Sequence, residues 1–246
     1  MTSSRCPGRP GALHAWKMDA RKAIALQKKL ARRVVLQPLD VKAVRYVAGV
    51  DVSFPGGPPW MRRMPSEGAA AAVVYDVFEK RVVETAHARG AAGMAYVPGL
   101  LSFREGPIVI EALKKLRHVF DVIMADGQGI AHPRRLGIAS HVGLWTGKPA
   151  FGCAKSLLVG AVQGRLGEKA GACRRIVHGG EVVGAAYRTR SGVKPVYVSP
   201  GHLMDLASVT ALMKRLRGKY RLPEPVRAAH FAAGSRRRSS AEQREP

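Results

Sequence analysis

Residues 45–54 read RYVAGVDVSF, an apolar run that contains a single acid, Asp51, between Val50 and Val52. So many valines in a short run are typical of a buried β-strand. A carboxylate buried in such a strand costs several kcal/mol unless it is paired with a cation or bound to a metal. The stretch therefore predicts a buried strand whose acid has a partner.

Further strand-like runs follow along the chain. AAAAVVYDVF (69–78) and KRVVETAHARG (80–90) come next with short connections, which favours an antiparallel meander. FDVIMADGQG (120–129) is predicted to be a buried strand that ends in a glycine loop. A strand near 150–154 and a hairpin formed by 181–189 and 194–199 complete the set.

Helical periodicity separates and flanks these strands. A basic amphipathic helix is predicted over 12–36, ended by Pro38, and we favour packing on the sheet over nucleic-acid binding for it. Pro107 suits the first turn of a helix over 107–118. Further helices are expected over 135–146, over 205–217 and from 222 onwards. The alternation predicts an α/β fold with a mixed sheet flanked by helices.

The length and composition fit one globular unit with short appended segments. The 246 residues are 46% hydrophobic, which suffices for one sizeable core. We expect a disordered N-terminus over 1–10, a single domain over 11–234 and a disordered basic tail over 235–246. The Pro/Gly-rich linker 55–68 either contacts DNA through Arg62 and Arg63 or is an insert without contacts, and we favour the insert.

The formal net charge of +24 favours polyanionic partners, nucleic acid first. The alternative is that basic tails raise the charge without a binding role. No stretch of 18 apolar residues and no secretory signal occur, so no membrane partner is expected. The three cysteines show no paired spacing, which argues against structural zinc and fits a reducing, cytoplasmic location. No obligate protein partner is inferred.

Three acids stand where acids are unusual. Asp51 interrupts an apolar strand, Asp126 ends another, and Glu105 follows a Tyr-Val-Pro-Gly turn in YVPGLLSFRE (96–105). Ligands of open α/β sheets gather at the carboxyl ends of strands, and carboxylates there suit Mg²⁺, with Mn²⁺ as a substitute. Because the chain is rich in Lys and Arg, ordinary salt bridges are the alternative; the three acids together favour a metal.

A second constellation is DGQGIAHPRRLGIASHVG (126–143), in which two glycines allow close backbone approach and His132-Pro133-Arg134-Arg135 precedes a helix start that favours anions. A turn with a solvated basic cap would explain the arginines alone. Lys155 and His230 say little individually, and Cys153 is most simply a small buried residue.

Several stretches together resemble the endonuclease V family of deaminated-base nucleases. They are GVDVSF (49–54), YVPGLLSFRE (96–105), the block 126–143, AKS (154–156), VSPGH (198–202) and LPEPVRAAH (222–230). The resemblance implies a ribonuclease H-like fold and an endonuclease V-like catalytic domain over 11–234. It also implies Mg²⁺-dependent hydrolysis of the second phosphodiester 3′ to deoxyinosine in DNA containing deaminated bases.

The resemblance also implies roles for individual residues. The family's catalytic acids, which hold the metal, fall on Asp51, Glu105 and Asp126, its active-site histidine on His230 and its phosphate-contacting lysine on Lys155. The strand-separating wedge falls on Tyr96, Val97, Pro98 and Gly99. The lesion pocket falls on Gly99, Leu101, Gly127, Gly129, His132, Gly137 and Ile138.

Two other functions stay open at this point. Inosine-containing RNA would be cut by the same fold, and contacts to a 2′-hydroxyl, which would distinguish it from DNA, cannot be read from the sequence. A non-catalytic nucleic-acid binder would use the charge alone, and the three acids argue against it.

Overall fold

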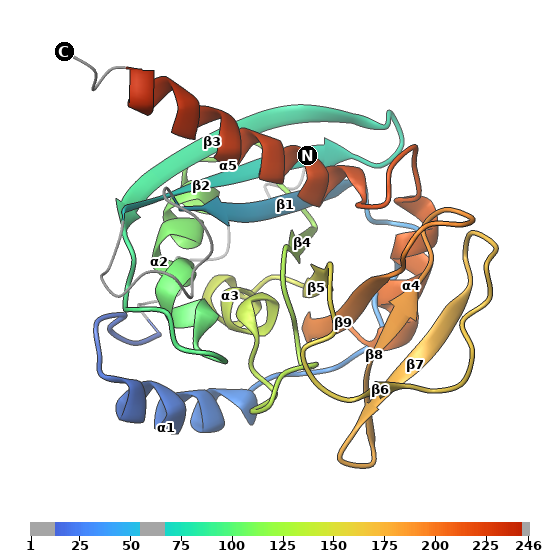
Figure 1. Ribbon diagram of the computed structural model, residues 1–246. Coiled ribbons are helices and arrows are strands. Elements are labelled where there is room, and N and C mark those ends of the chain that lie inside the picture. The colour runs from blue at the N-terminus through green and yellow to red at the C-terminus, as the bar shows by residue number, and fades with distance from the viewer. Residues whose placement is uncertain (1–12, 55–66, 243–246) are drawn as a thin grey trace, which may run out of the picture.

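The computed structural model describes residues 13–54 and 67–242, with the backbone alone from 235 onwards (Figure 1). The helices and strands follow one another in the order α1 (Ala20–Ala31), β1 (Tyr46–Ser53), β2 (Glu67–Asp76), β3 (Arg81–Ala91), α2 (Leu101–Lys114), β4 (Val122–Ala125), α3 (Ile138–Thr146), β5 (Ala150–Ala154), β6 (Ala161–Val162), β7 (Cys173–His178), β8 (Glu181–Tyr187), β9 (Val196–His202), α4 (Leu206–Arg215) and α5 (Glu224–Glu242).

The strands form one sheet in the order β3-β2-β1-β4-β5-β9-β8-β7-β6. β4 pairs in parallel with β1 and with β5, and the remaining neighbours are antiparallel. The mixed sheet and the β1-β2-β3 meander predicted from the sequence are confirmed. The parallel centre places the carboxyl ends of β1, β4 and β5 at one edge, where ligands of α/β folds bind.

Helices cover both faces of the sheet because its strands alternate apolar residues to both sides. Ala48 and Val50 of β1 lie in the core under α2 and α3, whereas Val47 lies in the core that includes Val209 of α4 and Val226 of α5. Figure 1 shows α5 running across β1 and β2. The odd-numbered positions of β1 therefore face α5.

The strands β6 and β7 were not predicted. β7 carries the exposed Arg174 and Arg175, so it lacks the apolar run that marks a buried strand. The hairpin from β7 to β8 turns at Gly179 and Gly180, both with positive φ (60° and 80°). A Gly-Gly pair between two short runs is a hairpin signal, so this pair is a sequence feature from which β7 could have been predicted.

Helix α2 begins six residues before Pro107, so the predicted helix 107–118 was wrong at both ends. The proline lies inside the helix, where it cannot donate to the carbonyl of Phe103. The loop before the helix contacts the same turn, where Gly93 N–H donates to the neighbouring Arg104 carbonyl (3.0 Å). As a result Glu105 lies within a helix rather than in a turn.

Helix α1 is shorter than the predicted 12–36. Asp19 caps its start by accepting a hydrogen bond from Lys22 N (2.8 Å). Its buried face carries Ala23, Gln27 and Leu30, one polar residue among apolar ones. The segment after it is extended, with Val35 O accepting from Leu203 N (2.8 Å).

Two other boundaries differ from the predictions. α3 begins at Ile138 rather than at 135, after Arg135 in the left-handed region (φ 59°). α5 continues to Glu242, so the backbone of 235–242 is helical where we predicted the start of a disordered tail; Arg, Ala and Glu favour helix there and no proline interrupts it. The predicted disorder at 1–10 and most of the linker 55–68, with Arg62 and Arg63, lie outside the described residues.

Candidate active site

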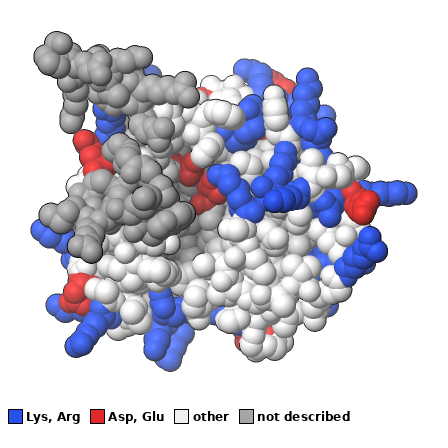
Figure 2. All heavy atoms as spheres, viewed as in Figure 1, with Lys and Arg blue, Asp and Glu red and all other residues white. Residues whose placement is uncertain are grey.

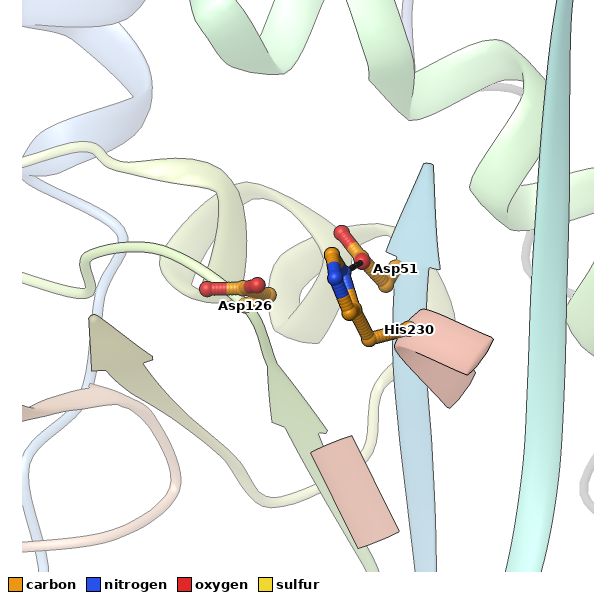
Figure 3. A group of neighbouring side chains, drawn as sticks. All are labelled: Asp51, Asp126 and His230. Carbon is orange, nitrogen blue, oxygen red and sulfur yellow. Dashed lines mark hydrogen bonds and ion pairs between the residues drawn. The ribbon is translucent and has the colours of Figure 1, made fainter. Parts of the chain in front are cut away.

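Two carboxylates meet because β1 and β4 pair in parallel. The register aligns Val47 with Val122 and Val50 with Ala125, so the next pair in line is Asp51 and Asp126. The pairing extends to this point, since Asp126 N donates to Val50 O (3.1 Å). Figure 3 shows both side chains beyond the end of β4, with Asp51 on β1. Both predicted acids therefore lie at the carboxyl edge of the parallel strands.

His230 joins them from α5, which covers the face to which Asp51 points. Its Nδ1 lies 2.6 Å from Asp51 Oδ2 (Figure 3). This hydrogen bond raises the pKa of His230 above its ordinary value, although partial burial opposes the effect. One potential ligand atom from each of Asp51, Asp126 and His230 lies within 4.8 Å of the other two. The three residues can hold a metal ion.

Glu105 approaches the same acids from the second turn of α2. It is buried, and burial, followed by the charges of Asp51 and Asp126, raises the pKa of its carboxyl well above the ordinary value. Glu105 does not belong to the group of ligand atoms within 4.8 Å. It is close enough to both aspartates for their charges to repel its own.

Lys155 lies directly after β5 and pairs with Asp126, with Nζ 2.6 Å from Oδ2. Burial and the neighbouring Asp51 raise the pKa of Asp126, and Lys155 opposes that effect. In this arrangement Lys155 pairs with Asp126 and His230 forms a hydrogen bond with Asp51. Among the described residues, Arg104 lowers the pKa of Glu105, as the smallest of the contributions to it.

This donor set fits a divalent cation. Three carboxylates from three elements converge, two of them with raised pKa values because like charges are buried together. A hard cation with oxygen ligands is the partner that would relieve this repulsion. The imidazole of His230 adds one nitrogen ligand or a proton donor at the rim, where its side chain is 51% exposed.

A cavity of about 320 Å³ opens beside the acids. Asp126 and Lys155 line it on the side of the carboxylates, and Tyr96 lines it as well. Six of the seven residues predicted for the lesion pocket line this cavity: Gly99, Leu101, Gly127, His132, Gly137 and Ile138. The cavity is thus continuous with the carboxylate cluster through Asp126 and Gly127.

Gly129, the seventh, lies behind the cavity rather than on its wall. A Cβ on Gly129 would lie 1.9 Å from the Pro200 carbonyl oxygen, so only glycine fits there. Its N–H donates to Ser199 Oγ (2.6 Å). Gly127 has a different role, because its φ of 151° is one that side chains rarely adopt. Gly129 therefore fixes the loop after β4 against β9, and Gly127 allows the backbone conformation with which that loop begins.

The segment Tyr96–Gly99 is anchored through one carbonyl. Gly99 O accepts from Gln27 Nε2 (2.9 Å), His132 Nε2 (3.0 Å) and Arg134 Nη2 (2.7 Å). Gln27 is fully buried and also donates to Leu136 O (3.0 Å). Sequence reasoning missed Gln27; its signal was a polar residue on the buried face of a helix. The anchor joins the segment to α1 and to the loop before α3.

The arginines of the 126–143 block do not form the anion site that we expected at a helix start. Arg134 binds Gly99 O and Gln27 Oε1, and Arg135 pairs with Glu181 (2.6 Å). His132 accepts from Arg134 N at Nδ1 (3.1 Å), so its Nε2 carries the proton given to Gly99 O. Burial, reinforced by Arg134, lowers the pKa of His132 to about 4, which keeps the ring neutral.

Comparison with known proteins identifies the family. The profile of endonuclease V matches residues 28–231. Endonuclease V of Methanothrix thermoacetophila is 45% identical over 227 residues, which cover 92% of this chain and 96% of that protein. The chain belongs to the endonuclease V family. It is therefore an endonuclease, and the ribonuclease H-like α/β fold implied by the sequence resemblance is confirmed.

Solved endonuclease V structures have the same architecture. The Bacillus subtilis protein superposes with a TM-score of 0.86 at 33% identity, covering 94% of this chain and 97% of that one. The Streptomyces avermitilis protein gives 0.82 at 38% identity, covering 92% and 96%. In the described part of this endonuclease, no helix is both long and apolar enough to cross a bilayer.

Proposed function

We propose that this endonuclease recognises deaminated bases in DNA, chiefly deoxyinosine, and hydrolyses the second phosphodiester bond 3′ to the lesion with Mg²⁺. Asp51, Glu105 and Asp126 would hold the metal, with Mn²⁺ as a substitute, and His230 would act at the same centre. We further propose a cytoplasmic location, which fits the free thiols of Cys153 and Cys173.

One observation carries this proposal: the carboxylate cluster and the glycine-lined cavity share a wall at Asp126-Gly127. An enzyme that inspects a base must take it out of the stack into a pocket. A base held in this cavity would leave its own backbone beside the carboxylates. Recognition and hydrolysis then lie within one or two nucleotides of each other, which supports cleavage close to the lesion.

The residues of the chain would divide the chemistry between them. When bound, Mg²⁺ supplies charge neutralisation at the phosphate and lowers the pKa of water. Lys155, released from Asp126, would contact a phosphate oxygen. His230, whose pKa is raised by Asp51, can give a proton at the rim of the site, where a leaving oxygen needs one.

Inosine in RNA is the second candidate substrate. Ciona intestinalis endonuclease V, 25% identical to this chain, was solved with DNA that contains an inosine followed by a ribo-adenosine. That complex supports inosine as the base and gives a reason to test a ribose beside it. Parallel cleavage of matched deoxyinosine DNA and inosine RNA strands tests the proposal. Faster cleavage of the RNA would favour the second candidate, and no Mg²⁺-dependent cleavage of either would refute both.

Tyr96→Ala is expected to weaken binding of deoxyinosine DNA about tenfold, the loss typical of one aromatic stacking contact. Tyr96 lines the cavity and belongs to the anchored segment that we propose as the wedge. Tyr96→Phe keeps the ring and should bind nearly as tightly as the wild type. Binding is measured by fluorescence anisotropy, and metal affinity by calorimetry. A loss of metal affinity equal to the loss of DNA affinity would contradict the wedge role.

Binding should fall steeply with salt. The formal charge is +24, and Figure 2 shows Lys and Arg side chains beside a central group of acidic side chains, towards the side that carries α4 and β7–β9. We expect log Kd to change with log salt by a slope steeper than about 3, which corresponds to more than three neutralised phosphates. Undamaged DNA of equal length should give the same slope, because phosphate contacts do not depend on the base; a flat response would exclude this interface.

A further inference from the structure

A chain of hydrogen bonds leads from the surface into the cavity. His14 Nδ1 lies 2.8 Å from Ala15 O, His14 Nε2 lies 2.7 Å from His141 Nε2, and His141 Nδ1 lies 3.0 Å from Ser102 Oγ. Ser102 lines the cavity beside Leu101. The proposed chemistry of cleavage uses none of the three side chains.

The outer end of this series of hydrogen bonds determines which group donates in each of them. Because a carbonyl only accepts, His14 Nδ1 must donate to Ala15 O, and the Nε2 of a neutral His14 must accept. His141 Nε2 therefore donates to His14. The Nδ1 of a neutral His141 then accepts, so the hydroxyl of Ser102 must donate to it. The hydroxyl proton of Ser102 therefore points to His141 and is not available to a group in the cavity.

The surroundings hold both rings neutral and in place. His141 is fully buried, and burial, with a smaller contribution from His14, lowers its pKa to about 3. Burial also lowers the pKa of His14. The ring of His141 packs against Trp16 and Phe103, with centroids 4.8 and 4.9 Å away, so it cannot turn freely.

The same residue also offers a donor. Ser102 and Leu101 begin α2, and in the described part of the chain their backbone N–H groups have no acceptor. Ser102 therefore offers the cavity a backbone N–H as a donor and its Oγ as a group that can only accept. A donor beside an obligate acceptor complements an N–H next to a carbonyl, the lactam edge that hypoxanthine has at N1 and C6. Adenine has the reverse polarity at those positions.

We propose that Ser102 is a specificity residue that reads the lactam edge of the extruded base, and that His141 and His14 are positioning residues that fix its hydroxyl as an acceptor. The inference rests on the proposed function, since it assumes that the cavity holds the base. Its ligand class is a six-membered ring with adjacent N–H and C=O groups.

The test compares two DNA duplexes, one with deoxyinosine and one with 1-deazadeoxyinosine, in which C–H replaces N1–H. Binding is measured without added metal, so that cleavage does not interfere. We expect the wild type to prefer deoxyinosine about tenfold, the effect of one hydrogen bond in a buried site. Ser102→Ala should bind both duplexes equally, and Ser102→Thr, which keeps the hydroxyl, should keep the preference.

His14→Phe tests the polarity itself. It preserves an aromatic ring against Trp16 but frees His141 to change tautomer, so that the Ser102 hydroxyl can turn towards the base and the preference should shrink. His118→Phe, on the connection that leads into β4, is the matched control and should keep it. The inference would be overturned by a Ser102→Ala protein that retains the tenfold preference for deoxyinosine over 1-deazadeoxyinosine. It would also be overturned by a wild type that selects deoxyinosine DNA over undamaged DNA but binds the two modified duplexes equally. A wild type that does not distinguish deoxyinosine from undamaged DNA would instead refute the proposed function.

Discussion

Replacing Asp126 with asparagine is expected to lower the rate of deoxyinosine DNA cleavage about a thousandfold, the upper range for loss of one electrostatic group in an active site. Asp126 is the residue that the carboxylate cluster and the cavity share. Asparagine has nearly the same shape but no charge, so the fold should persist while metal affinity falls. DNA binding should be unchanged or tighter, since a negative charge near the phosphates is removed. Single-turnover cleavage and anisotropy measure the two effects.

Asp121→Asn is the control for this change. Asp121 precedes β4 at its opposite end, where its carboxylate accepts from the backbone N–H groups of Arg45 and Tyr46 (2.8 Å each). The substitution removes the same charge next to the same strand without contacting the carboxylate cluster. The cleavage rate should stay within about twofold of the wild-type rate, as expected for a surface change. If Asp126→Asn cuts as fast as Asp121→Asn, the assigned centre is wrong.

The aspartates could be predicted from the sequence because a strand imposes a simple rule. Each of them ends or interrupts an apolar run, and parallel strands bring such positions to one edge. His230 could not be predicted to face Asp51 from pattern alone, since α5 reaches that face only through the packing of the fold. The family resemblance supplied its role, and the structure supplied its contact at 2.6 Å.

Glu105 shows where local signals mislead. Pro107 is a strong helix-start signal, so the sequence indicated a turn before it, yet α2 already includes Glu105. Burying Phe103 and Leu100 against α1 contributes roughly 3–6 kcal/mol. This offsets the cost of a proline inside a helix, which is about 3 kcal/mol. Gln27 was missed for a related reason: its polar side chain has three partners that lie about 70 or more positions away along the chain.

Glu105→Gln is expected to abolish efficient cleavage and, at the same time, to stabilise the metal-free protein. The pKa of Glu105 is raised well above its ordinary value by burial and by Asp51 and Asp126. Its ionised form is therefore disfavoured in the folded state, and stability is lost as the pH rises from the ordinary value of the carboxyl towards the raised one. Glutamine carries no charge at any of these pH values, so the variant should not incur this loss.

The expected increase in Tm at pH 7.5 in EDTA is about 3 °C or more, which corresponds to about 1 kcal/mol in a domain of this size. Mg²⁺ should raise the Tm of the wild type by neutralising the cluster, and raise that of the variant much less. At pH 4, below the ordinary pKa of a glutamate, the two proteins should differ less, because Glu105 is then protonated in both the folded and the unfolded states. Calorimetric melting curves at both pH values measure this.

Glu111→Gln provides the comparison within the same helix. Glu111 is exposed and, among the described residues, pairs with Lys114 (2.7 Å), so its loss should change stability by less than about 0.5 kcal/mol and leave cleavage intact. A Glu105→Gln protein that is inactive but no more stable than this control would mean that the buried carboxylates do not repel one another. The charge of Glu105 would then be needed for cleavage without destabilising the metal-free fold, and the proposed connection between charge repulsion and metal binding would be wrong.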